Sequence, residues 1–224
     1  SSTAGVMAML LIIIVVLISS IYPSRIASEI AIPDVTRAWK LPEPEGDKMR
    51  IELPFLVRSS EQAFAGGFLL EYYNGHADIS HGDFSTENIT CTFMPPDNLV
   101  AKGLIPDAVQ QDAAGDACLT FDFKAWLAPF DFGVRQHVQL IMCPSESHHG
   151  FKEIHVILTR EAGEKRVWQN LNRPFLHGLR KQLLVWRSIE KSARKNYEDD
   201  FKNAFAQIGK DIPHTAMENK GDSA

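Results

Sequence analysis

The sequence predicts an α+β domain preceded by one membrane-spanning helix. Three patterns carry this prediction: an uncharged apolar run near the start, five stretches of alternating apolar and polar residues, and two stretches with helical spacing near the end. They predict one N-terminal transmembrane helix, a mostly antiparallel sheet of about five strands, one early helix and a C-terminal helical pair. With 45% hydrophobic and 23% charged residues, the chain can bury one core.

The apolar run covers residues 4–22, which include no charged side chain and no proline. At about 1.5 Å per residue it reaches about 28 Å, close to the ~30 Å core of a bilayer. We therefore expect a transmembrane helix in residues 1–22. A secretory signal peptide is the alternative, but the nearby basic residues follow the run, as Arg25, Arg37 and Lys40, and none precedes it. This bias predicts an inner-membrane protein with its C-terminal domain in the cytoplasm.

Three residues at the end of the run suit the membrane–water interface. The ring of Tyr22 is amphipathic, Pro23 lets the chain leave the helix axis, and the cation of Arg25 can meet lipid phosphates. Residues 23–47 begin with this proline and end in a proline-rich acidic segment. They are predicted to form a juxtamembrane turn and an extended linker, and membrane lipids are the first expected partner.

Five stretches then alternate at the strand period of two. They are centred on residues 49–53, 89–93, 119–123, 134–142 and 154–158. The last two are separated by the turn-forming segment 144–150, so they are predicted to be antiparallel neighbours. Residues 95–115 are predicted to form a long polar connection.

The early helix is predicted between the first two strands. Ser59 or Ser60 can cap it, and Gly75 is predicted to end it in the left-handed conformation. The adjacent pair Gly66 and Gly67 either weakens this helix or marks close packing against another element.

The C-terminal helical pair follows the last strand. Asn172 is predicted to cap the first helix with Pro174 in its first turn, and a second helix covers about residues 190–206. The folded domain is thus predicted to span residues 48–206, with a flexible tail at 207–224.

The end of the apolar run resembles a known family. Residues 17–27 read Leu-Ile-Ser-Ser-Ile-Tyr-Pro-Ser-Arg-Ile-Ala, and residues 32–35 read Ile-Pro-Asp-Val. This order is similar to the end of the last transmembrane helix in FtsX-like and MacB-like ABC transporter permeases. The resemblance covers about 35 of 224 residues. The resemblance implies further spanning helices upstream and a separate ATPase subunit. The first residue is Ser rather than Met, which also suggests an upstream part. The resemblance does not extend to the domain that follows, since such permeases usually end soon after this helix.

The domain carries no nucleotide-binding or hydrolase motif of the types G-x-x-x-x-G-K-[ST], G-x-G-x-x-G or G-x-S-x-G. We expect no cofactor and no enzymatic activity. A membrane-anchored enzyme is an alternative, and it would need one cleft to hold four side chains, namely His76, Asp78, His81 and Asp83.

Metal-binding residue types are present without a metal-binding pattern. His148 and His149 are adjacent and are predicted to lie in a solvent-exposed turn. The three cysteines, Cys91, Cys118 and Cys143, are far apart and odd in number, so they are predicted to be buried free thiols.

An aromatic segment at residues 126–133 reads Trp-Leu-Ala-Pro-Phe-Asp-Phe-Gly between two predicted strands. It is either a partner-binding edge or ligand pocket, or a hydrophobic plug beneath a bend, and the plug is the simpler interpretation.

A basic stretch lies in the C-terminal helices of a chain whose net charge is −5. Arginines recur there at intervals of seven, at Arg173, Arg180, Arg187 and Arg194. In one continuous helix they would share a face, which is either an ordinary solvated face or a site for anionic lipids or an acidic partner. Nucleic acid is not expected, because the chain is acidic and has no aromatic platform among these residues.

These observations predict the C-terminal part of an FtsX/MacB-like ABC transporter permease with an appended cytoplasmic domain for regulation or docking. The alternative is a single-pass, membrane-anchored binding or scaffold module unrelated to transport.

Overall fold

The computed structural model describes residues 7, 9, 41–76, 82–106 and 117–207, and the described residues from Leu41 onward belong to one compact unit. None of the helices in these ranges has both the length and the apolar character of a membrane span. The span predicted at residues 1–22 lies outside the described residues except for Met7 and Met9, and so do the predicted interface residues Tyr22, Pro23 and Arg25. Of the predicted linker and tail, only residues 41–47 and Gln207 are described.

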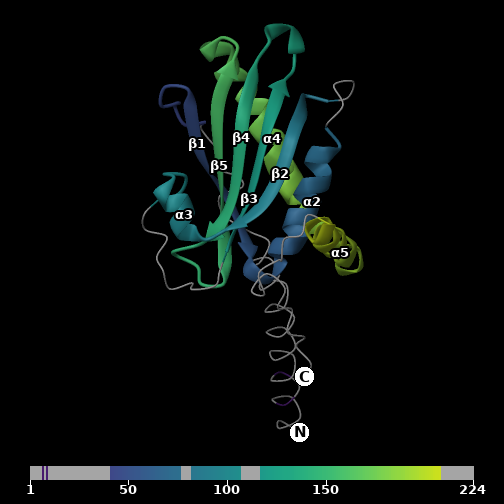
Figure 1. Cartoon of the computed structure of the whole chain (residues 1–224). Helices are drawn as coiled ribbons and strands as arrows, with labels where there is room; N and C mark the ends of the chain where they lie inside the picture. The colour runs from purple at the N-terminus through teal and green to yellow at the C-terminus, as the bar shows by residue number, and fades with distance from the viewer. Residues whose placement is uncertain (1–6, 8, 10–40, 77–81, 107–116, 208–224) are drawn as a thin grey trace. The chain divides into compact units, whose positions relative to one another are not determined.

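The predicted α+β domain is confirmed, with five antiparallel strands in the described chain (Figure 1). The strands are β1 (Lys48–Arg58), β2 (Phe84–Met94), β3 (Cys118–Leu127), β4 (Arg135–Pro144) and β5 (Phe151–Ala162). Their order is β1-β5-β4-β3-β2, so β2 to β5 form a meander and β1 returns to pair with β5. Both edge strands carry a bulge, between Leu53 and Leu56 in β1 and between Glu87 and Thr90 in β2, and such bulges discourage edge-to-edge pairing.

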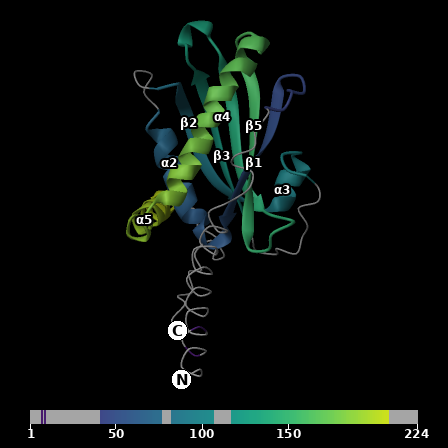
Figure 2. The same ribbon diagram turned by 180° about the vertical axis from the view of Figure 1, so that it is seen from behind.

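Within residues 41–76, 82–106 and 117–207, four helices and two 3-10 turns connect or cover the strands. They are η1 (Ser59–Glu61), α2 (Gln62–Asn74), α3 (Pro96–Ala101), η2 (Phe130–Phe132), α4 (Lys165–Ser188) and α5 (Lys191–Gln207). α2 and α4 lie over one face of the sheet, with α5 beside α2 (Figures 1 and 2). The side chains that alternate toward this helix-covered face form the main core, which includes Met49, Val138 and Val156.

The α2–α5 contact explains the glycine pair in α2. A Cβ on Gly67 would lie 2.2 Å from the backbone oxygen of Tyr197, and one on Gly66 would lie 2.8 Å from Phe201 and Leu119. The pair therefore marks close packing, because only glycine lets the backbone of α5 approach α2 so closely. The buried rings of Phe201 and Phe205 show which face of α5 packs inward.

The first C-terminal helix begins earlier than predicted. α4 starts at Lys165, so Pro174 lies inside the helix and Asn172 is not its cap. Asn172 is fully buried and its side-chain nitrogen donates to the carbonyl of Trp168, one turn earlier. Trp168 is also fully buried, and burying this ring against the sheet favours the extra turns despite the interior proline.

Two further expectations were wrong in detail. The connection predicted as polar at residues 95–115 contains α3, in which Leu99 is buried against Ile141 and Ile157 on the face of the sheet opposite α4. Gly75 follows α2 with a φ of −64°, in the right-handed rather than the left-handed region. The helix ends there because the chain turns toward β2, where the carbonyl of His76 accepts from the amide of Thr86.

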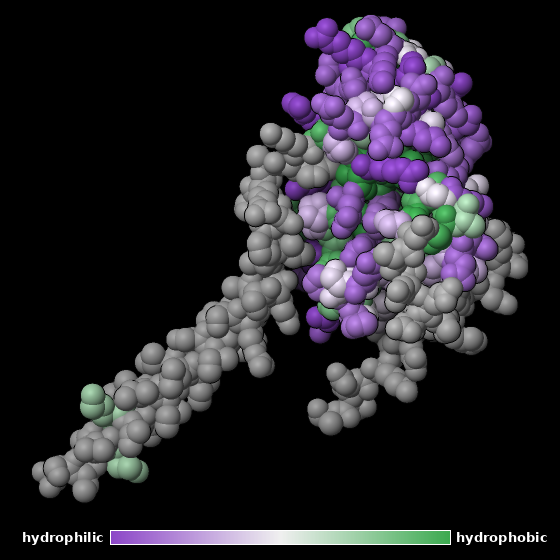
Figure 3. Space-filling model, turned by 90° about the vertical axis from the view of Figure 1, so that its left-hand side faces the viewer, coloured by the Kyte–Doolittle hydropathy of each residue, from purple (hydrophilic) through white to green (hydrophobic). Residues whose placement is uncertain are grey.

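Viewed from the side of β1 and α3, the described surface is mostly hydrophilic (Figure 3). Hydrophobic residues gather across the middle of this view, between hydrophilic regions above and below. Some apolar surface is normal for a globular domain, because apolar atoms contribute more than half of the accessible surface of folded proteins.

Candidate functional site

The face of the sheet opposite α4, called here the open face, has two halves. α3 and residues 102–105 cover one half, where Cys118, Ile141 and Cys143 are buried beneath them. The other half carries polar and aromatic side chains of β2 to β5 that reach the surface. Because no helix covers the second half in the described chain, this half is the candidate binding surface.

A tryptophan–arginine pair lies in this exposed half, at the end where the β3–β4 hairpin closes. Trp126 of β3 and Arg135 of β4 are directly paired across the hairpin, so their side chains lie on the same face. The guanidinium carbon of Arg135 lies 5.3 Å from the centroid of the Trp126 ring, a cation–π arrangement. Both side chains are half-buried, which leaves part of each available to a partner.

Acidic side chains on both sides hold this pair in place. The indole nitrogen of Trp126 donates to Oε1 of Glu87 on β2 at 2.9 Å. Nε of Arg135 lies 2.9 Å from Oε2 of Glu161 on β5, at an angle that makes this an ion pair rather than a hydrogen bond. Nζ of Lys124 lies 3.2 Å from the other oxygen of Glu161. We call these five residues the Trp126 cluster, and it joins four neighbouring strands.

The aromatic turn next to the cluster is only partly the predicted plug. Leu127 and Val134 are buried where the hairpin closes, but Phe132 is 56% exposed. The turn contains a cis bond between Ala128 and Pro129, and Gly133 adopts a φ of +60° at the end of η2. Phe132 lies at the surface at the same end of the sheet as the Trp126 cluster.

A second polar group continues the surface along β3 and β4. Nε2 of His137 lies 2.6 Å from Oδ1 of Asp122, and the amide nitrogen of Gln139 donates to the other oxygen of Asp122 at 3.2 Å. The side chains of Asp122 and His137 are 48% and 29% exposed. Asp122 is thus held at a defined position while remaining open to solvent.

The geometry of this half suits the binding of another protein. Tryptophan and arginine are the residues most enriched among energetically dominant interface positions. Side chains held by ion pairs and hydrogen bonds on a rigid sheet lose little conformational entropy when a partner binds. The sequence singled out Trp126 as the start of an aromatic segment, but it did not indicate Arg135, Glu87 or Glu161. The only signal for them is strand alternation, which places Trp126 and Arg135 on one face once the hairpin register is known.

A cysteine–histidine group lies beneath the covered half. Cys143 hydrogen-bonds with Cys118, and this bond and burial raise the pKa of the Cys143 thiol, although His155 acts in the opposite direction. Burial lowers the pKa of His155, but its hydrogen bond with Cys143 and the charges of Glu52 and Glu153 outweigh burial and raise it. A thiol with a raised pKa stays protonated near neutral pH, so this arrangement does not supply a nucleophile. As predicted, all three cysteines are buried, and none of them forms a disulfide.

The residues considered for an enzyme are only partly described. His76 stacks on Phe84 at 4.3 Å, and its Nδ1 lies 2.8 Å from the carbonyl oxygen of Tyr72, so it completes the end of α2. Asp83 is exposed, and burial together with Asp83 raises the pKa of Tyr72 to about 12. Asp78 and His81 lie outside the described residues.

The structure places His148 and His149 in the exposed β4–β5 turn, as predicted. Within residues 41–76, 82–106 and 117–207, no three histidine, cysteine or acidic side chains are placed to hold a metal ion.

The four arginines at intervals of seven do not form one surface. Arg173 is exposed on α4, whereas Arg187 is half-buried, donates to the carbonyl of Leu56 and lies over the ring of Phe55. Arg180 is also half-buried, and Arg194 belongs to α5 because α4 ends at Ser188. An α-helix has 3.6 residues per turn, so residues spaced by seven drift around it by about 20° per repeat. The spacing therefore carries the later arginines toward the packed side.

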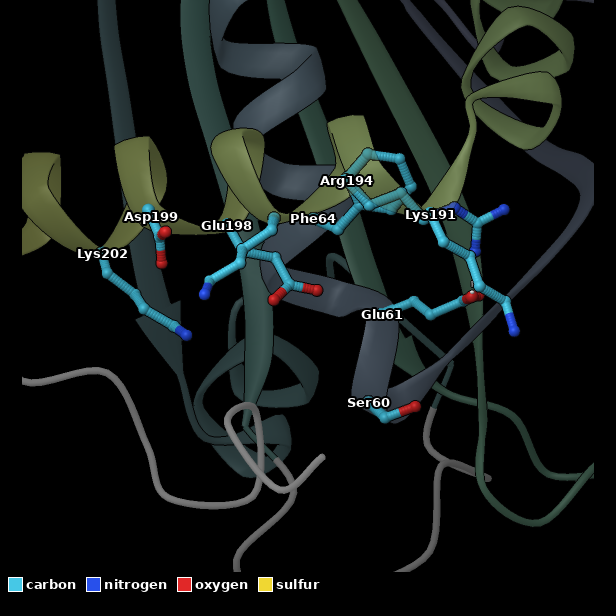
Figure 4. Close-up of a pocket in the computed structure, with 9 residues that line it drawn as sticks. Ser60, Glu61, Phe64, Lys191, Arg194, Glu198, Asp199 and Lys202 are labelled. Atoms are coloured by element: carbon cyan, nitrogen blue, oxygen red, sulfur yellow. Dashed lines mark hydrogen bonds and ion pairs between the residues drawn. The ribbon is translucent and has the colours of Figure 1, made fainter. Parts of the chain in front are cut away.

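Arg194 instead closes one end of a charged groove between η1, α2 and α5 (Figure 4). The groove has a volume of about 450 Å³, and Arg194 lies 2.9 Å from Glu61 within it. Burial raises the pKa of Glu198, on the same wall. Because both basic and acidic side chains line the groove, it has no single charge sign with which to select a ligand. Its lining residues are Ser60, Glu61, Phe64, Lys191, Arg194, Lys195, Glu198, Asp199 and Lys202.

Comparison with protein-family models, with curated proteins and with solved structures finds no match to this chain.

Proposed function

We propose that this chain is the C-terminal part of an FtsX/MacB-like transporter permease, and that its folded domain is a cytoplasmic docking domain. The Trp126 cluster on the open face is its protein-binding surface. The domain acts by binding, and we assign it no catalytic role.

One observation supports the docking role: the half-buried side chains of Trp126 and Arg135 form a cation–π pair that is held from both sides. Glu87 orients the indole and Glu161 orients the guanidinium, so the pair is in position before a partner arrives. Exposed Phe132 adds apolar area at the same end of the sheet. An aromatic and arginine centre with a charged surround is the usual composition of an interface that binds another protein.

The transporter context rests on the resemblance at residues 17–27 and 32–35 and on the apolar run before it. In that context the natural partner is the separate ATPase subunit, because the domain would be fused to the membrane part of the same complex. The alternative context is a single-pass anchored module with a partner unrelated to transport. The Trp126 cluster would then have the same binding role.

The first experiment is to sequence the reading frame upstream of Ser1 together with the neighbouring genes. We expect further spanning helices in frame and an ATPase gene nearby. If neither is present, the permease proposal fails and the anchored module remains.

The second experiment measures the affinity of the full chain in detergent for that ATPase subunit. Trp126→Ala is expected to raise the dissociation constant roughly thirtyfold, as for loss of an interface hot spot of about 2 kcal/mol. Arg58→Ala is the matched control, since Arg58 is exposed at the end of β1 and lies outside the cluster. If both variants bind as the unaltered chain does, the Trp126 cluster is not the docking surface.

A further inference from the structure

The helix α4 has an unusual charge for a chain that is acidic overall. Between Lys165 and Ser188 there are six lysines and arginines and no aspartate or glutamate, whereas the whole chain carries a net charge of −5. The charge of this helix is therefore positive, opposite in sign to the net charge of the chain. At about 1.5 Å per residue, its 24 residues form a basic rod about 36 Å long on the outside of the helix layer.

The exposed residues of α4 follow one line along its outer surface. Arg166, Arg173, His177, Lys181 and Leu184 are all exposed, at spacings of seven, four, four and three. The total of 18 residues equals five turns of 3.6, so the first and last lie at the same angle around the helix. This line is the outer face of α4. Of the four arginines spaced by seven it includes only Arg173, because the later ones drift toward the packed side or belong to α5.

The outer face combines positive charge with apolar side chains. Leu184 and Val185 are each 43% exposed at its C-terminal end, and they are among the few large apolar residues exposed in the described chain. The packed side is separate and apolar, with Leu176, Leu179 and Leu183 buried against the domain. The outer face of α4 can therefore contact another surface while the opposite side stays packed on the sheet.

We infer that the outer face of α4 docks on an anionic membrane surface. Its basic residues match lipid phosphates, each contributing about 1 kcal/mol near such a surface, and Leu184 and Val185 can enter the headgroup region. A membrane is the favoured occupant over an acidic protein because of this apolar pair. The uncharged run at residues 4–22 also ends only about 25 residues before β1. This inference does not depend on which protein binds the Trp126 cluster.

The test places an environment-sensitive dye on the outer face of the full chain. Asn170→Cys introduces an exposed thiol on this face, and the three natural cysteines are buried, so labelling is selective. We expect the dye emission to shift to the blue and rise with vesicles of phosphatidylcholine and phosphatidylglycerol. It should not change with phosphatidylcholine alone, and the response should fall as salt is added. A dye at Thr90→Cys, exposed on the open face, should not respond.

The variant Arg166→Gln, Arg173→Gln, Lys181→Gln is expected to weaken this docking on the order of a hundredfold, because three charge contacts are lost. The matched control is Lys48→Gln, Arg58→Gln, Lys102→Gln, which removes three exposed charges elsewhere and should leave the dye response unchanged. Circular dichroism confirms that each variant is folded.

Two results would overturn the inference. One is a dye response that is equal with neutral and anionic vesicles, or equal in the two triple variants. The other is a response to soluble polyglutamate but not to anionic vesicles, which would assign the face to an acidic protein. The dye responses to vesicles do not depend on whether Trp126→Ala weakens ATPase binding. The membrane inference for α4 and the docking proposal for the Trp126 cluster can therefore fail independently.

Discussion

The two faces of the sheet are built by opposite means, and each carries a tryptophan that shows the difference. Trp168 of α4 is fully buried on the helix-covered face, where its indole nitrogen donates to the buried Gln136 at 2.7 Å. Trp126 lies on the open face, is half-buried, and is held by Glu87 and by the cation of Arg135. Burial of apolar surface holds the side chains of the helix-covered face in place. Charged and polar contacts at the surface hold those of the open face. The first makes the domain stable, and the second leaves oriented side chains free for a partner.

The comparison is tested most directly by removing each tryptophan in turn. Trp168→Ala is expected to lower the free energy of unfolding by about 4 kcal/mol, since it deletes a fully buried ring and leaves the side chain of Gln136 without its donor. Trp126→Ala is expected to lower it by only about 1 kcal/mol, the scale of one cation–π contact and one exposed hydrogen bond. Urea unfolding followed by circular dichroism measures both. Equal losses would show that the open face contributes to stability as much as the core does.

The contact between α2 and α5 tests how tightly the helix layer is packed. Gly67→Ala is expected to destabilise the domain by about 3 kcal/mol, because the new Cβ would lie 2.2 Å from the backbone oxygen of Tyr197. Gly178→Ala in α4 is the matched control, since its Cβ would meet only the hydroxyl of Tyr72, at 3.7 Å. That change should be neutral or stabilising by up to about 1 kcal/mol, the helix propensity of alanine over glycine. Thermal unfolding of both variants decides whether α5 is firmly packed on α2.

The smallest expected effect is a pH dependence beneath the covered half of the open face. The pKa of folded His155 is raised above its ordinary value of about 6.5, so the imidazolium is favoured in the folded state. This stabilisation is fully present below about pH 6.5 and is lost as the pH rises through the folded pKa. His155→Gln should flatten the stability profile in this window, and Glu52→Gln should reduce its slope, because it removes one of the charges that raise the pKa. A profile for His155→Gln that still falls with pH as the unaltered chain does would contradict this assignment.

The sheet and most helices could be predicted because their signals are local. Alternation at 119–123 and 154–158 depends only on which residues face the core, and the spacing of Phe201 and Phe205 depends only on the helical period. The predictions that failed depended on contacts between elements. Pro174 and Asn172 look like a helix start until the burial of Trp168 extends α4 backward, and α3 exists because Leu99 covers the sheet beneath it.

The candidate surfaces show the same division between local and tertiary information. The antiparallel α+β domain, the buried thiols and the basic stretch in the C-terminal helices could be predicted from the order of residues, because composition and periodicity follow from it. The structure was needed to show that Trp126 lies beside Arg135, and that Arg166, Arg173 and Lys181 rather than Arg187 form the outer face of α4. Strand register decides which residues of different strands become neighbours. Which residues of α4 are exposed depends on their angle around the helix relative to the side that packs on the sheet.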